Sequence, residues 1–199
     1  MLLVSRSSST ATYHHGNLQA ALEDAALSLL ETQPAARISL REVARRAGVS
    51  HNAPYHHFGD RAALLHALGV RAMRELVEAQ EAAVDAATGP VERVRALGAA
   101  YVGYAAEHPQ AFALVFDPEY CAPGDPDADM APLITRNEEL LAREVAALVR
   151  EPGFAGRDPA ALAAALWATV HGMAELVMLG HLPREAAEPA LAALVSAGA

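Results

Sequence analysis

The chain of 199 residues carries 15 basic and 24 acidic side chains, which gives a formal net charge of −9, and 53% of its residues are apolar. Such a composition is typical of a globular protein that buries its core without disulfides or a structural metal. The single cysteine, Cys121, excludes a disulfide-framed secreted scaffold, because one thiol has no partner within the chain. Apolar residues recur at helical spacing and no segment alternates with period two, so we expect an all-α fold.

The sequence predicts neither export nor a membrane span. Leu2, Leu3 and Val4 form a short apolar run that a Ser/Thr-rich segment follows, and this run is too short for a signal peptide. The longest apolar stretch without Asp, Glu or Arg, residues 159–174, is shorter than the roughly 20 residues that cross a bilayer. We therefore expect a cytoplasmic protein that has no membrane partner.

Charge is unevenly distributed along the chain. Residues 1–70 hold six arginines against five acidic residues, whereas residues 71–199 hold nine arginines against nineteen acidic residues. Six of the nine histidines also fall within residues 1–70. A polyanion such as DNA would therefore meet the N-terminal third, while the acidic remainder would repel it.

The first elements in chain order are an arm and a helix. Residues 1–12 are rich in Ser and Thr and lack apolar periodicity, which predicts a mobile, disordered arm. Asn17 can cap a first helix, and this helix ends before Pro34.

Residues 39–58 predict a helix-turn-helix. Ser39 and Glu42 form a capping box that starts a helix at Leu40, and Gly48 ends this helix. Ser50 is placed to cap a very short third helix, in which Pro54 removes a backbone donor and favours a short or distorted helix. Two short helices joined by a glycine-containing turn place the second helix in the major groove of DNA.

The rest of the chain predicts further helices. Asp60 is placed to cap a fourth helix that runs to about Ala87, and the balance of charge changes near residues 60–70, within this helix. Residues 117–132 contain four prolines and four aspartates, which predicts an acidic, irregular loop. The remaining helices are expected at residues 91–107, 109–116, 133–151, 159–180 and 184–197.

Two segments carry a resemblance to a known family. The opening YHHGNLQAAL, the centre SLREVARRAGVS and the continuation APYHHFGDRAALLHAL make residues 13–68 resemble the DNA-binding domain of TetR-type transcriptional regulators. Residues 167–172, WATVHG, resemble the Trp/His-Gly (WHG-type) signature of one C-terminal domain of that family. The resemblance implies a helix-turn-helix DNA-binding domain over residues 13–68 and a helical ligand-binding and dimerisation domain over residues 69–199.

The resemblance also implies which residues contact DNA. The recognition surface would consist of Ser50, His51, Asn52, Ala53, Tyr55 and His56. The flanking phosphate contacts would come from Ser39, Arg45, Arg46 and Arg61. The chemistry agrees, because asparagine pairs with adenine through two hydrogen bonds, an alanine methyl group contacts the thymine methyl group, and Ser, Tyr and Arg donors hold phosphates. Arg61 stands where the family usually has a lysine, a cation of different geometry.

Other roles for these residues remain open. Arg45 and Arg46 point in different directions on a helix, so one of them can pair with Glu42 instead of a phosphate. Tyr55 can belong to the core, with its hydroxyl group reaching the backbone. The adjacent pairs His14-His15 and His56-His57 each point about 100° apart on a helix and have no cysteine beside them, so we expect no metal site.

The helix expected at residues 159–180 has two apolar faces, so it must be covered on two sides. One face meets its own core, and the other meets a second subunit or a ligand cavity. The helix at residues 133–151 is its expected companion. In the resembled family the last two long helices form a four-helix interface with their symmetry mates, which implies a homodimer through residues 133–151 and 159–180.

One stripe of this helix predicts a ligand pocket. Trp167, His171 and Glu175 are spaced four apart, so that Glu175 can hydrogen-bond His171 while Trp167 closes a pocket with aromatic residues of earlier helices. An aromatic pocket with few polar groups suits a small, largely apolar effector. Simple core packing of Trp167 and His171 is the alternative. The candidate ligand-binding residues are Tyr101, Tyr104, Phe112, Phe116, Trp167, His171, Glu175 and Met178.

These observations predict a homodimeric, ligand-responsive DNA-binding regulator of transcription, a repressor that a small molecule releases from a palindromic operator. No nucleophile-base pair, phosphate loop or metal-ligand spacing is present in the sequence, so we expect neither an enzyme nor a cofactor. The alternative is a dimeric helical interaction module that no longer binds DNA. Salt-sensitive binding to duplex DNA distinguishes the two.

Overall fold

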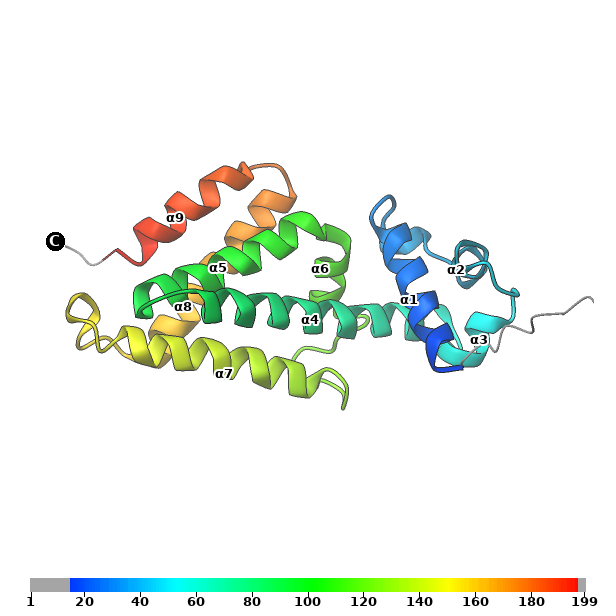
Figure 1. The fold of residues 1–199 in the computed structure, drawn as a ribbon, viewed down its shortest axis with the longest axis horizontal. Coiled ribbons are helices and arrows are strands. Elements are labelled where there is room, and N and C mark those ends of the chain that lie inside the picture. Colours follow the sequence, from blue (N-terminus) through cyan, green and yellow to red (C-terminus); the bar gives the residue numbers. More distant parts are fainter. Residues whose placement is uncertain (1–14, 197–199) are drawn as a thin grey trace, which may run out of the picture.

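The computed structural model describes residues 15–196 and folds them into helices, without strands in that range (Figure 1). The all-α prediction is thus confirmed for the described chain, and the arm expected at residues 1–12 lies outside it. The α-helices are α1 (His15–Leu30), α2 (Leu40–Ala47), α3 (Ala53–Phe58), α4 (Arg61–Ala86), α5 (Pro90–Glu107), α6 (Pro109–Phe116), α7 (Ala131–Leu148), α8 (Pro159–Met178) and α9 (Ala187–Leu194). Short 3₁₀ turns lie at Ala35–Arg37, Pro152–Phe154 and Arg184–Ala186.

The N-terminal unit consists of α1, α2, α3 and the first turns of α4 around one apolar core. Leu22 of α1, Val43 of α2 and Leu64 of α4 are fully buried in this core. Figure 1 shows α4 leaving the N-terminal unit and entering the larger group formed by α5 to α9. The helix therefore contributes to both cores.

The serine half of the capping box, the glycine stop of α2 and the cap of α4 are confirmed. The Ser39 hydroxyl oxygen accepts a hydrogen bond from the backbone N–H of Glu42 at 3.3 Å. Gly48 ends α2 with a φ of 70°, a conformation that side-chain-bearing residues rarely adopt. The Asp60 carboxylate accepts a hydrogen bond from the backbone N–H of Ala63 at 2.8 Å and caps α4.

The expected cap of the third helix is wrong. Ser50 lies in a turn, where its carbonyl oxygen accepts a hydrogen bond from the N–H of Ala53 at 3.0 Å, and α3 begins at Ala53. A helix capped by Ser50 would need a hydrogen bond from the nitrogen of residue 54 to the Ser50 carbonyl, and Pro54 has no N–H. The helix starts later, so that Pro54 falls in its first turn, where the missing donor is tolerated. With six residues, α3 is short, as expected.

The other boundaries lie close to those expected. The first helix begins at His15, so Asn17, the expected cap, falls inside α1. The helices of the C-terminal two thirds start and end within three residues of the expected positions, and the last one opens with a 3₁₀ turn before α9. The segment between α6 and α7 is irregular, as its proline and aspartate content predicts.

In the C-terminal unit, α5 packs between α4 and α8, with α7 and α9 on the flanks (Figure 1). Two glycines allow close helix approach. A Cβ atom at Gly98 of α5 would lie 2.9 Å from the Leu191 side chain of α9, and one at Gly69 of α4 would lie 3.3 Å from the Leu114 carbonyl oxygen of α6. Leu114 also packs into the N-terminal core, and so does Tyr120 of the following loop. Thus α6 and this loop join the two units alongside α4.

Among the described helices, α8 is the one that is long and apolar enough to cross a membrane by length and composition alone, with a mean hydropathy of 1.4. Only 22% of its most apolar window is buried. Its outward face carries small and apolar side chains, including the exposed Ala161, Ala165, Ala168 and Leu176, and the exposed Leu179 follows its last residue. An uncharged exposed face of this kind is typical of a surface that takes part in an interaction.

Candidate nucleic-acid interface and ligand cavity

The expected recognition surface is exposed on α3 and the turn before it. The side chains of Ser50, His51, Asn52 and His56 are exposed, and Ala53 is half-buried. Tyr55 is 47% exposed, so it belongs to this surface and not to the core. On the opposite side of α3, Pro54 and Phe58 are buried, and Phe58 packs into the N-terminal core. The short helix is therefore held by its inner face and presents the outer face to solvent.

A groove between α2 and α3 brings part of the predicted DNA-binding set together. It is lined by Ser39, Arg41, Glu42, Arg45, His51, Asn52 and Tyr55. The Arg45 side chain is 74% exposed and lies 3.9 Å from the Glu42 carboxylate, which is a loose ion pair. Arg41 was not among the predicted residues, although its position four residues before Arg45 puts both on one face of α2.

The other two predicted phosphate contacts are occupied within the protein. Arg46 donates a hydrogen bond to the Ser28 hydroxyl of α1. Arg61 donates from Nε to the Ile38 carbonyl oxygen at 2.9 Å and from Nη2 to the Ala35 carbonyl oxygen at 2.7 Å. The fork of Arg61 thereby ties the start of α4 to the segment before α2. Contact of these two cations with phosphate stays a prediction.

Aromatic rings of α5, α6 and α8 gather around His171. The Tyr101 hydroxyl lies 2.8 Å from Nδ1 of His171, and the Phe116 and Trp167 rings lie 4.7 and 5.9 Å from the His171 ring. Burial raises the pKa of Tyr101 far above its usual value, so its hydroxyl keeps its proton in this hydrogen bond with His171. The hydrogen-bond partner of His171 is thus Tyr101 and not the expected Glu175. The fully buried Phe112 packs edge-to-face on Tyr101 at 5.3 Å.

Tyr104 does not join this cluster, contrary to expectation. Its hydroxyl donates to the Glu75 carboxylate of α4 at 3.2 Å, and its ring lies 4.9 Å from the His108 ring. Tyr104 is one turn further along α5 than Tyr101 and lies beside α4 instead of α8. Burial, together with the negative charge of Glu75, raises the pKa of the Tyr104 hydroxyl.

Two neighbouring cavities lie between α4 and α8, and Asn137, Leu141 and Trp167 belong to the walls of both. The larger has a volume of about 450 Å³ and is bounded by α4, α6, α7, α8 and the loop before α7. Its lining is mostly apolar and includes Phe116. The smaller encloses about 40 Å³, and Tyr101 lies in its wall.

Two polar atoms in the wall of the smaller cavity have no hydrogen-bond partner within the described residues. They are Oε1 of Gln80 on α4 and Nε of Arg95 on α5. Gln80 is only 5% exposed. A buried oxygen without a donor is costly, and a bound molecule or water that donates a hydrogen bond would remove this cost.

The predicted ligand-binding residues therefore divide into three groups. Phe116, Tyr101 and Trp167 line a cavity, while His171 and Phe112 pack behind them. Tyr104, Glu175 and Met178 are not among the residues that line either cavity. Gln80 and Asn137 were missed by the sequence analysis, because nothing in an amphipathic helical pattern distinguishes an inward amide from a surface one.

Comparisons with known proteins agree with the fold. The family model described as bacterial regulatory proteins, tetR family, matches residues 22–68, and the model described as tetracyclin repressor-like, C-terminal domain, matches residues 94–197. The solved structure of a protein with unknown function from a Rhodococcus species is 35% identical, with a TM-score of 0.77 over 93% of this chain and 97% of that one.

Two further relatives carry regulator names. The TetR family transcriptional regulator PfmR from Thermus thermophilus is 22% identical, with a TM-score of 0.66 over 95% of this chain and 99% of that one. The HTH-type transcriptional regulator BetI from Rhizobium meliloti is 40% identical over 77 residues, or 39% of this chain. The chain matches only 38% of the length of BetI. The WHG-type subtype of the C-terminal domain stays a prediction.

Proposed function

Since the chain belongs to the TetR family of bacterial regulatory proteins and is a DNA-binding regulator of transcription, we propose that it is a homodimeric repressor that an apolar effector releases from its operator. The observation that carries the proposal is that one helix, α4, reaches from the exposed α3 surface to the apolar cavity beside Trp167. DNA binding belongs to residues 13–68, and effector binding and dimerisation to residues 69–199. Such a protein acts by binding alone and performs no catalytic step.

The α3 surface is proposed to enter the major groove of operator DNA. Asn52 is the residue with the chemistry to pair with an adenine, and His51 and Tyr55 lie beside it on the same surface. Ser39, Arg41 and Arg45 line the rim of the groove, where they would hold phosphates on either side. The N-terminal third carries a small net positive charge, whereas the rest of the chain is acidic and repels DNA. This difference in charge would orient the N-terminal unit toward DNA.

A second copy of the chain is proposed to cover α8 and α7. Two recognition helices related by a two-fold axis read half-sites about 34 Å apart, which requires a near-palindromic operator. The uncharged outward face of α8 supplies the apolar surface that a stable dimer buries. Pairing of two copies also accounts for the low burial of α8 within one chain. With this apolar face covered by a second copy, the regulator is proposed to work in the cytoplasm.

The effector is proposed to enter the larger cavity and to reach the smaller one past Trp167. The apolar lining selects a small, largely apolar molecule, and Oε1 of Gln80 favours one that carries a hydrogen-bond donor. In one conformation of the dimer the two recognition helices are spaced to fit the operator, and in another they are not. An effector that binds the second conformation more tightly shifts the population toward it and so lowers the affinity for DNA. Trp167 is the only tryptophan, so its fluorescence reports occupancy directly.

The first test is a fluorescence-anisotropy titration of the full chain against duplexes tiled across the DNA that flanks its own gene, with scrambled duplex as competitor. Competitor-resistant binding at two subunits per site is expected. Absence of duplex binding at low salt by a chain that still dimerises would overturn the proposal and favour the interaction module.

Two variants and a control sharpen this titration. Arg45→Ala removes an exposed cation, so it is expected to weaken binding to the operator and to the scrambled duplex alike. The slope of log affinity against log salt concentration should fall by about one per subunit. Asn52→Ala is expected to weaken the operator alone, by about 1–3 kcal/mol. The control is Arg74→Ala, an exposed arginine on α4 outside the α3 surface and outside the helices of the proposed dimer interface, which should change neither.

A further inference from the structure

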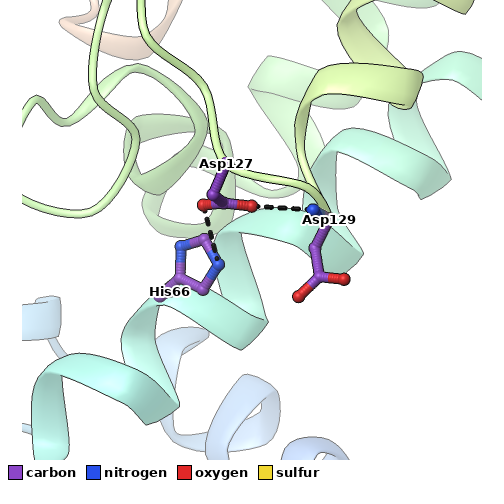
Figure 2. A group of neighbouring side chains, drawn as sticks. All are labelled: His66, Asp127 and Asp129. Carbon is purple, nitrogen blue, oxygen red and sulfur yellow. Dashed lines mark hydrogen bonds and ion pairs between the residues drawn. The ribbon is translucent and has the colours of Figure 1, made fainter.

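Three side chains with metal-ligand chemistry meet where the loop before α7 crosses α4. His66 comes from α4, and Asp127 and Asp129 come from the loop (Figure 2). One donor atom from each lies within 4.8 Å of the other two. His66 is half-buried and both aspartates are exposed, so an ion from solvent can reach all three.

The imidazole of His66 is oriented by a backbone carbonyl. Nδ1 lies 2.8 Å from the Tyr120 carbonyl oxygen, which can only accept, so Nδ1 carries the proton and donates it. In the neutral ring Nε2 then holds a lone pair, and this lone pair faces Oδ2 of Asp127 at 3.2 Å. A cation placed between these two atoms would be attracted by both of them.

The carboxylate of Asp127 is fixed in the same way. Its Oδ1 accepts hydrogen bonds from the backbone N–H groups of Asp129 at 2.8 Å and Met130 at 3.0 Å, which leaves Oδ2 directed at His66 (Figure 2). Outer hydrogen bonds of this kind hold the ligands of metal sites in place. In a zinc site each nitrogen or oxygen ligand atom lies about 2.1 Å from the ion. If the angle between the two ligand atoms at the ion is about 100°, they lie about 3.2 Å apart, so the observed distance between Nε2 of His66 and Oδ2 of Asp127 suits shared coordination.

We propose that His66, Asp127 and Asp129 form a binding site for a divalent transition-metal cation of the Zn²⁺ type. One imidazole nitrogen and two carboxylate oxygens suit such an ion, and water would fill the remaining positions. The site lies outside the two cavities and uses none of the residues of the α3 surface.

The position of this site predicts an effect on DNA binding, and this consequence rests on the proposed function. The loop that carries Asp127 and Asp129 also carries Tyr120, whose side chain packs against the N-terminal core. His66 lies on α4, between Leu65 and Leu68, which are buried in the same core. A bound cation would fasten the loop to α4 at the junction of the two units and so favour one relative placement of them.

The site is tested by titrating chelator-treated full chain with Zn²⁺ by calorimetry and with Co²⁺ by visible absorption. The key variant is Asp129→Asn, because the Asp129 side chain is exposed and its loss leaves the His66–Asp127 contact intact. The expected result is a saturable binding event, one ion per subunit, whose affinity falls at least about 10-fold in this variant. The matched control is Asp125→Asn, an aspartate of the same loop outside the trio, and it should bind as the unaltered chain does.

Equal ion binding by the chain and Asp129→Asn, or no binding to this loop at millimolar Zn²⁺, would overturn the site. A further measurement compares operator affinity with and without Zn²⁺. A shift in the unaltered chain that Asp129→Asn abolishes supports the regulatory consequence. If Zn²⁺ binds but the operator affinity does not change, only the regulatory consequence is refuted. A chain that binds Zn²⁺ but binds no operator would contradict the proposed function and leave the metal site standing.

Discussion

Replacing Arg61 with alanine separates a structural role from a DNA-contact role. The variant removes two charge-assisted hydrogen bonds, to the carbonyl oxygens of Ala35 and Ile38, at a half-buried position. Bonds from charged donors contribute about 1.5–3 kcal/mol each, and with partial exposure we expect a combined loss of about 2–4 kcal/mol in the free energy of unfolding. For a chain of this length such a loss lowers the melting temperature by roughly 5–15 °C.

Thermal unfolding followed by circular dichroism measures this shift. The melting temperature of Arg61→Lys should lie between those of the unaltered chain and Arg61→Ala. An ammonium group keeps the charge but lacks the planar guanidinium geometry that reaches both carbonyl oxygens. Arg37→Ala, an exposed arginine in the same segment, serves as the matched control and should melt as the unaltered chain does. The reasoning is refuted if Arg61→Ala melts unchanged and loses only the salt dependence of DNA binding.

Three further variants test the C-terminal unit. Tyr101→Phe removes the hydrogen-bond partner of Nδ1 of His171 and should lower the free energy of unfolding by about 1–3 kcal/mol in urea titrations; unchanged stability would mean that the hydrogen bond contributes nothing. Gln80→Leu removes a buried oxygen without a partner, so we expect stability to be kept or raised by about 1 kcal/mol while the effector response falls, and a marked loss of stability would contradict this. Leu176→Glu places a charge on the uncharged face of α8 and should shift sedimentation toward the monomer, whereas a fully dimeric variant would show that this face is not the interface.

Features set by neighbouring residues could be predicted from the sequence. The cap at Ser39, the glycine stop at Gly48 and the cap at Asp60 each depend on residues three or four positions apart, and the structure has all of them. The late start of α3 is also local. Its cause is the missing N–H of Pro54. This feature predicted a short or distorted helix, although the start was still expected at Ser50.

Features that depend on distant residues could not be predicted. Local patterns do not indicate which carbonyl oxygens Arg61 will reach, because these lie more than twenty residues earlier in the chain. The partner of His171 is Tyr101, seventy residues away, whereas helical spacing favoured Glu175. His66 meets Asp127 for the same reason, only after the loop has folded back on α4.

The length of α4 has a consequence for how motion is amplified. At 1.5 Å per residue, its 26 residues form a rod about 39 Å long that is shared by the two units. If its C-terminal end is held and the rod tilts, each degree of tilt moves the other end by about 0.7 Å. A tilt of a few degrees, caused by a small change in the cavity, would thus reach α3 as a displacement comparable to the length of a hydrogen bond.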